Sequence, residues 1–172
     1  MTAESNATAR GRALFRELQW VHSIVRSDLE VVERLAAEVG DGLPGEAVQE
    51  RLDELRTNGP LWQLKINCLR YCRFVHSHHG AEDVLLFPAL RAANPSLGPV
   101  VDRLETDHRR VSDLLDAVEA AARALNGTGD DHARERVVTA LGELHVHLLE
   151  HLDFEERAAG PTIRSLDGLA LG

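Results

Sequence analysis

Apolar residues recur at every third or fourth position along four long stretches of the chain, which is the spacing of an amphipathic helix. Runs rich in glycine, proline and asparagine separate these stretches and are expected to end the helices. The pattern predicts long helices over about 9–39, 61–93, 99–125 and 132–158. A weaker pattern predicts a short extra helix over 46–57, and residues 161–171 are expected to form a short tail helix or a frayed end.

Four long amphipathic helices with modest connections pack most simply around a shared core. We therefore expect an all-α fold, an antiparallel up-down-up-down four-helix bundle with the short extra helix between the first two long helices. Aromatic residues make up only 4% of the chain, which also favours helix over sheet. A chain of 172 residues is long enough for one domain and too short to expect two, so we expect a single domain over 1–172 with its core at about 9–163.

The second long helix contains two residues that disturb helical structure. Gly80 costs up to ~1 kcal/mol relative to alanine, and Pro88 removes a backbone hydrogen bond from the helix interior. We therefore expect a bend near Pro88. The inward stripe of this helix is expected to comprise Leu64, Tyr71, Phe74, Val75, His78, Glu82, Leu85, Leu86 and Ala89.

Polar residues interrupt the apolar stripe of every long helix. A single histidine does so in the first and third helices, whereas the second and fourth carry a histidine and a glutamate four residues apart. That spacing places both side chains on one helix face, about one turn apart. A proline follows each of the two glutamates six residues later, which makes a chance match of the two motifs less credible. The six interrupting residues are His22, His78, Glu82, His108, His151 and Glu155.

Six such groups on the core faces of a bundle would be costly without partners, because burial penalises unpaired carboxylates and imidazolium groups. A bound metal removes this cost. Four neutral imidazoles and two carboxylates suit a dinuclear site, since each carboxylate can bridge two ions while histidines fill terminal positions. The set is too large and too hard for a structural zinc ion, which takes four ligands and often thiolates. Iron or manganese is therefore expected, with iron preferred for the imidazole content.

The charge of the chain narrows the range of partners. It has 28 acidic and 19 basic residues, a formal net charge of -9, and no basic stripe, which argues against a nucleic-acid partner and favours a cation. The N-terminal segment lacks the apolar centre of a signal peptide, and no run approaches the ~18 apolar residues of a membrane span. We expect a soluble cytoplasmic protein with no membrane partner.

Two cysteines, Cys68 and Cys72, lie four residues apart on the second predicted helix. A Cα separation of roughly 6 Å permits a disulfide, but side chains that leave a helix in parallel directions are poorly placed for one. We interpret the cysteines as thiols in a reducing compartment and as small buried hydrophobic residues. A redox-sensing pair is the alternative.

Taken together, these motifs resemble the hemerythrin-like, or HHE cation-binding, family. The resemblance covers about residues 14–163 and rests on HSIVRSDL, HHGAEDVLLFP, LETDHRRV and HLDFEERAAGP. It implies an antiparallel four-helix bundle around two iron ions, which form a carboxylate- and oxo- or hydroxo-bridged di-iron centre. The implied terminal ligands are His22, His78, His108 and His151, and the implied bridges are Glu82 and Glu155. The oxygen-carrying hemerythrins of invertebrates instead have a fifth histidine and an aspartate in place of the last glutamate, so a simple carrier role is not expected.

Four histidines fall off the predicted stripes, and for each an exposed or supporting role is favoured over ligation: His76, His79, His132 and His145. Among them, His79 forms with Asp83 the main rival to the pair of His78 and Glu82. We retain His78 because its spacing to the downstream proline matches that of His151.

His147 lies one helical turn before His151, on nearly the same face. A fifth ligand or pocket residue and a plain surface histidine are equally compatible with this position. In a pocket, His147 would be a candidate catalytic residue that donates or accepts a proton. Tyr71, two turns before His78, is expected to be a core residue rather than a hydrogen-bond donor to the site.

Two functions suit a centre of this kind. The first is a di-iron oxidoreductase or redox protein whose open position binds or reacts with dioxygen, hydrogen peroxide or nitric oxide, which includes catalase-like detoxification of peroxide. The second is a non-catalytic module that binds or senses iron or oxygen through metal-coupled folding. A metal-free structural bundle is least favoured, because its inward polar groups would be unpaired.

Overall fold

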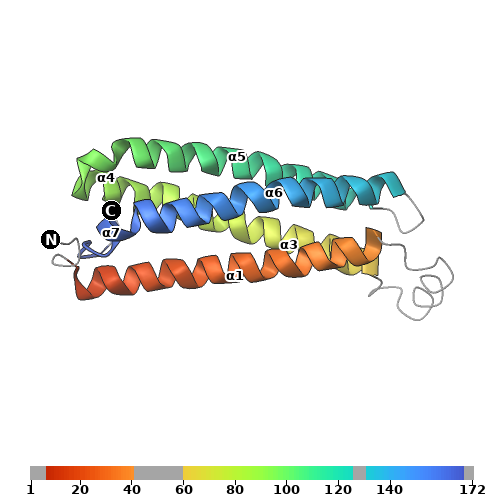
Figure 1. Cartoon of the computed structure of the whole chain (residues 1–172), viewed down its shortest axis with the longest axis horizontal. Helices are drawn as coiled ribbons and strands as arrows, with labels where there is room; N and C mark the ends of the chain where they lie inside the picture. Colours follow the sequence, from red (N-terminus) through yellow and green to blue (C-terminus); the bar gives the residue numbers. More distant parts are fainter. Residues whose placement is uncertain (1–6, 41–59, 126–130, 169–172) are drawn as a thin grey trace.

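The computed structural model describes residues 7–40, 60–125 and 131–168 of the chain, and every element in these ranges is helical. The elements are α1 (Ala9–Gly40), α3 (Pro60–Ala81), the π-helical turn η2 (Glu82–Leu86), α4 (Phe87–Ala93), the 3-10 turn η3 (Pro95–Leu97), α5 (Gly98–Arg123), α6 (Asp131–Ala158) and α7 (Gly160–Ile163). The long helices α1, α3, α5 and α6 run along the long axis of the molecule (Figure 1). α1 packs against α3 and α6, and α5 packs against the same two helices.

The predicted all-α class is confirmed for the described residues, and the long helices begin and end within two residues of their predicted boundaries. The second predicted helix is continuous in extent but consists of α3, η2 and α4. In the described part of the predicted tail, up to residue 168, the one helix is α7, which ends at Ile163. The predicted extra helix over 46–57 lies outside the described residues.

The disturbance expected near Pro88 takes the form of the π-helical turn that directly precedes it. The backbone N–H of Phe87 donates to the carbonyl of Glu82, five residues earlier. Proline cannot donate a backbone hydrogen bond, and a π turn is one of the usual places where such an interruption is accommodated. Pro88 then lies in the first turn of α4, where its missing N–H costs little.

The π turn also corrects the predicted apolar stripe. A π turn adds one residue to a helical turn, so the inward positions after it are shifted by one residue. The buried residues are therefore Leu86, Phe87 and Leu90, whereas Leu85 and Ala89 are only half-buried. Before the turn, Phe74 was predicted to face inward but is 39% exposed, because the buried face of α3 follows Val75 instead.

Two hydrophobic cores fill the molecule: α1 and α5 contribute buried residues to both, α3 and α6 to the first, and η2, α4 and α7 to the second. One core includes Val25, Val75, Val111 and Leu148. The other, which lies toward α4 and α7, includes Leu18, Leu86, Leu104 and Ala159. Along the chain, residues of the two cores flank His22, His108, His79 with Glu82, and Glu155. The fold therefore contains a polar layer with an apolar core on either side.

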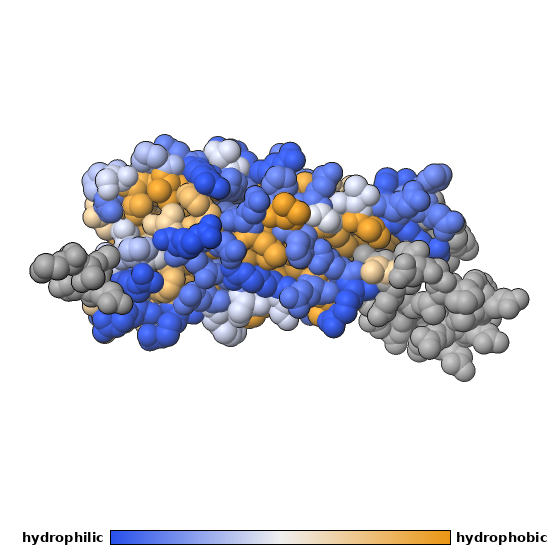
Figure 2. Space-filling view, viewed as in Figure 1, coloured by the Kyte–Doolittle hydropathy of each residue, from blue (hydrophilic) through white to orange (hydrophobic). Residues whose placement is uncertain are grey.

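The outer surface shows the opposite distribution. Figure 2 shows a face on which hydrophilic residues predominate, with apolar patches among them. None of the helices in residues 7–40, 60–125 and 131–168 combines the length and the apolar character needed to cross a membrane.

Cys68 and Cys72 are free thiols in the first of the two cores, as the sequence predicts for small buried residues. Burial raises the pKa of Cys68 to about 12, and burial likewise raises the pKa of Cys72, with the charge of Cys68 adding to the effect. Since the thiolate is the reactive form, both thiols should be unreactive in the folded protein.

We predict that iodoacetamide at about pH 8.5, where an exposed cysteine is roughly half ionised, will not modify the folded protein. The same treatment in denaturant should alkylate both Cys68 and Cys72, because unfolding restores their ordinary acidity. Mass spectrometry of the intact chain measures both results. Rapid labelling of the folded protein would instead support the redox-sensing alternative.

Candidate metal centre

The polar layer contains all the residues that the sequence analysis proposed as ligands, together with His79. α1 provides His22 and α5 provides His108. The remaining members come from α3 with η2 and from α6, and they are His78, His79, Glu82, His151 and Glu155. His22 and Glu155 are 0% exposed, and even His78, at the edge of the layer, keeps only 10% of its side chain exposed. Residues from four helices thus converge, while their role as ligands stays a prediction.

Glu82 lies at the centre of this arrangement, and its two oxygens face different histidines. Oε1 lies 3.3 Å from Nε2 of His78 and 3.9 Å from Nε2 of His22. Oε2 lies 3.5 Å from Nε2 of His108. A carboxylate with its oxygens directed to two groups of nitrogen donors has the geometry that a bridging ligand requires.

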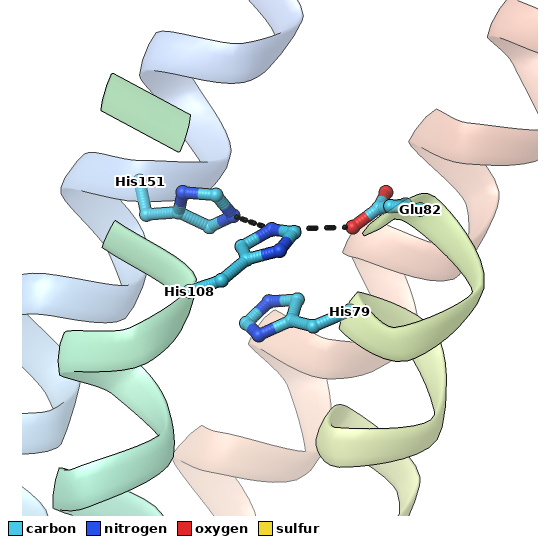
Figure 3. Close-up of side chains that lie close together, drawn as sticks. All are labelled: His79, Glu82, His108 and His151. Carbon is cyan, nitrogen blue, oxygen red and sulfur yellow. Dashed lines mark hydrogen bonds and ion pairs between the residues drawn. The ribbon is translucent and has the colours of Figure 1, made fainter. Parts of the chain in front are cut away.

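Glu155 approaches the same groups from α6. Its Oε2 lies 3.4 Å from Nε2 of His22 and 4.0 Å from Nε2 of His151. Nε2 of His151 in turn lies 3.1 Å from Nε2 of His108, a contact visible in Figure 3. Two imidazole lone pairs at this separation need a proton or a cation between them.

The donor atoms form two groups that can each hold a metal ion. His79, Glu82, His108 and His151 make up the first, and His22, His78 and Glu82 make up the second. Within each group, one donor atom per residue lies within 4.8 Å of all the others. Glu82 belongs to both groups, so the two positions are adjacent.

His79 corrects the sequence analysis, which placed it off the ligand stripe. It is only 5% exposed, and its ring stacks on that of His108 at a centroid distance of 4.0 Å and an angle of 7°. The buried face of α3 runs through Val75, His79 and Glu82, so His79 points inward and His78 lies at the edge of that face. Both neighbouring histidines therefore reach the layer (Figure 3 shows His79).

The rival pairing of His79 with Asp83 is wrong. Asp83 is exposed, and its Oδ1 lies 2.8 Å from Nδ1 of His108, on the neighbouring helix. Three other histidines have the surface positions that the sequence predicts. His76 is half-buried beside Asp116, His145 pairs with Glu33, and His132 is exposed near Glu135.

His147 is half-buried and has no hydrogen bond, ion pair or ring contact with any residue of the polar layer. Phe154, two turns later on the same side of α6, contacts Arg103 of α5, which places His147 on the flank of α6 toward α5. Tyr71 is 3% exposed and belongs to a hydrophobic core, as expected. Its hydroxyl has no hydrogen-bond partner among the described residues, so it donates nothing to the layer.

Carboxylates behind the layer orient two of its imidazoles. Nδ1 of His22 lies 2.9 Å from Glu156, and Nδ1 of His108 lies 2.8 Å from Asp83. Asp107 lies 4.0 Å from Nδ1 of His151, which is beyond hydrogen-bonding distance. An ionised carboxylate only accepts hydrogen bonds, so it favours the tautomer with the proton on Nδ1 and the Nε2 lone pair directed inward. Tautomers of this kind are ready to bind a metal ion.

The sequence analysis did not identify these supporting carboxylates, although the sequence position of the two that bond to imidazoles marks them. Asp83 directly follows Glu82, and Glu156 directly follows Glu155. In each motif the first acid points into the layer and the second bonds to the histidine of a neighbouring helix. Burial tends to raise the pKa of Glu156, but hydrogen bonds from His22 and Arg26 lower it below its usual value.

Burial keeps most of the imidazoles neutral. It lowers the pKa of His78 to about 3 and that of His108 to about 2, and neighbouring imidazoles contribute to both shifts. It also lowers the pKa of His79 well below the usual value. A neutral imidazole is the form that binds a metal ion.

His22 and Glu82 behave differently, because each has an ionisable partner. Burial alone would lower the pKa of His22, but the carboxylates of Glu155 and Glu82, 3.4 and 3.9 Å from its Nε2, raise it to about 10. Burial, reinforced by the charge of Glu155, raises the pKa of Glu82 to about 8. A proton in this cluster therefore performs part of the charge compensation that a cation would provide.

Most of the donor atoms in the layer still lack partners. Nε2 of His22, His78 and His79 and both oxygens of Glu82 and Glu155 are buried without a hydrogen bond. Leaving a buried polar group unsatisfied typically costs about 1–3 kcal/mol. Imidazole nitrogens and carboxylate oxygens of this kind are metal ligands, so the residues present fit a metal centre.

We predict that His78→Ala and His79→Ala will each weaken binding of Co²⁺ by roughly tenfold or more, since both nitrogens face the layer without partners. The intensity of the cobalt absorption bands during titration of the metal-free protein measures this affinity. His76→Ala, one turn earlier on α3, is the matched control and should bind as the wild type. Unchanged affinity in His79→Ala would assign that residue to packing alone.

Comparison with known proteins identifies the family of the chain. The sequence pattern of the hemerythrin family, described as the hemerythrin HHE cation binding domain, matches residues 58–163, more than half of the chain. No curated protein and no solved structure matches. The matched residues include both His-x-x-x-Glu motifs and His108 but not α1, whose His22 completes the polar layer. This chain belongs to the hemerythrin HHE cation-binding family.

Proposed function

We propose that this protein holds a di-iron centre in an antiparallel four-helix bundle and uses it to bind or react with small oxidants, namely dioxygen, hydrogen peroxide or nitric oxide. The observation that carries the proposal is the shared position of Glu82 between two groups of donors. Oε1 of Glu82 lies near His22 and His78, and Oε2 lies near His108.

The size and chemistry of the donor set support two iron ions. Five imidazoles and two carboxylates exceed what one ion with an open position takes from a protein. The absence of thiolates from the set favours iron over a structural zinc ion. When bound, iron supplies reversible electron exchange and an open position for a small ligand.

The chain itself would control access and orientation. The cores on either side contain Leu86, Phe87, Leu104 and Leu148, which exclude bulk water and large substrates from the layer. Asp83 and Glu156 hold two imidazoles in one tautomer, so these ligands need little reorganisation during a reaction.

His147 is the residue that we propose for proton transfer to or from a bound oxidant. It lies one turn before His151 on the flank of α6 toward α5, and it is half-buried. Imidazole is the side chain most often used for proton transfer in enzymes. This role would favour peroxide turnover over reversible binding.

The first test is the metal content and ligand chemistry of the protein. After anaerobic loading, elemental analysis should find about two iron atoms per chain, and nitric oxide should produce new visible absorption bands in the reduced form. Glu155→Ala should lose most of the iron, whereas Glu150→Ala, at an exposed position on the same helix, should retain it. A stoichiometry near one would contradict the di-iron assignment.

The second test concerns turnover. His147→Leu should keep its iron content and consume hydrogen peroxide more slowly, by up to about 10²-fold. That factor is the low end of the contribution that a general acid or base makes. The oxygen-electrode rate of the iron-loaded protein measures this. An unchanged rate would assign His147 to the surface. A wild-type protein that forms a long-lived adduct without consuming peroxide would favour binding or sensing instead.

A further inference from the structure

A pocket of about 370 Å³ opens between α3 and α5, on the side of the polar layer that holds His79 and His108. We call it the α3–α5 pocket. Its α3 side consists of His76, Gly80 and Asp83, and its α5 side consists of Glu105, Arg109 and Ser112. On both sides the residues are spaced by four and then three positions, so each set lies on one helix face directed at the other helix.

Gly80 keeps the middle of this pocket open. A Cβ atom built at Gly80 meets no atom within 4 Å, so the helix has free space there. His76 and Asp83 flank it, one turn before and one turn after. A large side chain at position 80 would occupy the space between the two helices.

The floor of the pocket is made of the stacked rings of His79 and His108, which are 5% and 4% exposed. Nε2 of His79 is buried and has no hydrogen-bond partner. The pocket therefore ends at an unsatisfied nitrogen donor that belongs to one of the two candidate metal groups.

The residues of the lining that can bind a cation become less exposed to solvent from the mouth of the pocket to its floor. The side chains of Asp83, Glu105 and His76 are 45%, 37% and 34% exposed, and those on the floor are almost fully buried. Carboxylate oxygens and imidazole nitrogens are the groups that bind divalent metal ions. A cation that enters the pocket meets such donors from its mouth to its floor.

The charges around the pocket also favour a cation. Asp83, Glu105 and Asp116, which pairs with His76, are acidic. The opposing positive groups are Arg109, whose guanidinium bonds to Thr106 on its own helix, and Arg91, which bonds to Glu105. The whole chain adds a net charge of -9. Negative surroundings raise the local concentration of cations and their rate of association.

We propose that the α3–α5 pocket is the path by which divalent metal ions reach the polar layer, with Gly80 as the residue that keeps the path open. The proposal rests on the metal centre of the proposed function and adds its loading route. At ~30 Å³ per water molecule the pocket holds roughly a dozen waters, so an ion enters with its hydration shell and exchanges water for protein ligands at the floor.

The proposal predicts a kinetic effect without a change in affinity. In the metal-free full-length protein, Gly80→Leu should slow Co²⁺ uptake by about tenfold or more. It should slow Co²⁺ removal by a chelator by the same factor, because a path affects both directions and leaves the dissociation constant unchanged. Stopped-flow absorption of the cobalt bands measures both rates.

Gly142→Leu is the matched control. Gly142 is also an exposed helical glycine with no atom within 4 Å of a built Cβ, but it lies on α6 and does not line the pocket. It should exchange Co²⁺ at the wild-type rate. Equal rates in the two leucine variants would overturn the proposal, and so would a slower uptake without an equally slower removal, since that would change the dissociation constant.

A second pair of variants tests the role of charge. Ser112→Lys should slow uptake of Co²⁺ by about tenfold relative to Ser112→Glu at low salt, and the difference should shrink as salt is added. Rates that do not depend on the charge at this position would overturn the route. A different result would contradict the proposed reaction with oxidants and leave the route intact: a protein with normal cobalt kinetics that, once loaded with iron, gives no spectral response to nitric oxide or peroxide.

Discussion

The structure depends on the cost of holding buried polar side chains between two hydrophobic cores. Such a layer weakens a helical bundle unless its charges and lone pairs are compensated. In this chain the compensation is distributed: burial keeps His78 and His108 neutral, and a proton near His22 offsets the buried carboxylates. Nε2 of His22, His78 and His79 and the oxygens of Glu82 and Glu155 remain without hydrogen bonds, which is why a metal centre accounts for the layer better than a purely structural role.

The acids that follow the two inward glutamates connect this centre to the packing of the helices. Asp83 joins η2 to α5 through His108, and Glu156 joins α6 to α1 through His22. Arg26 of α1 also bonds to Glu156 and Asp153, so the second connection continues to the surface. Each of the two links thus orients an imidazole and holds a pair of neighbouring helices together.

Periodicity was sufficient to predict the long helices, because each carries an apolar stripe that must face a core. For the same reason it placed His22, His108, His151 and Glu155 correctly in the buried layer. It could not separate His78 from His79, since adjacent residues differ by only 100° around a helix. The predicted stripe held both Phe74, which is exposed, and Val75, which is buried. The contacts of Asp83 and Glu156 depend on which helices are neighbours, which a single sequence does not state.

The π turn explains why one helix supplies so much of the centre. It begins at Glu82, directly after the α3 residues that bring His78 and His79 to the layer. Beyond it, the extra residue shifts the buried face to Leu86 and Phe87, so the helix supplies ligands on one side of the turn and a continuous apolar wall on the other. A regular helix would keep one stripe throughout and could not make this change of phase. Pro88, two residues beyond the turn in the first turn of α4, is therefore part of the construction of the site, because it cannot donate the regular hydrogen bond to the carbonyl four residues earlier.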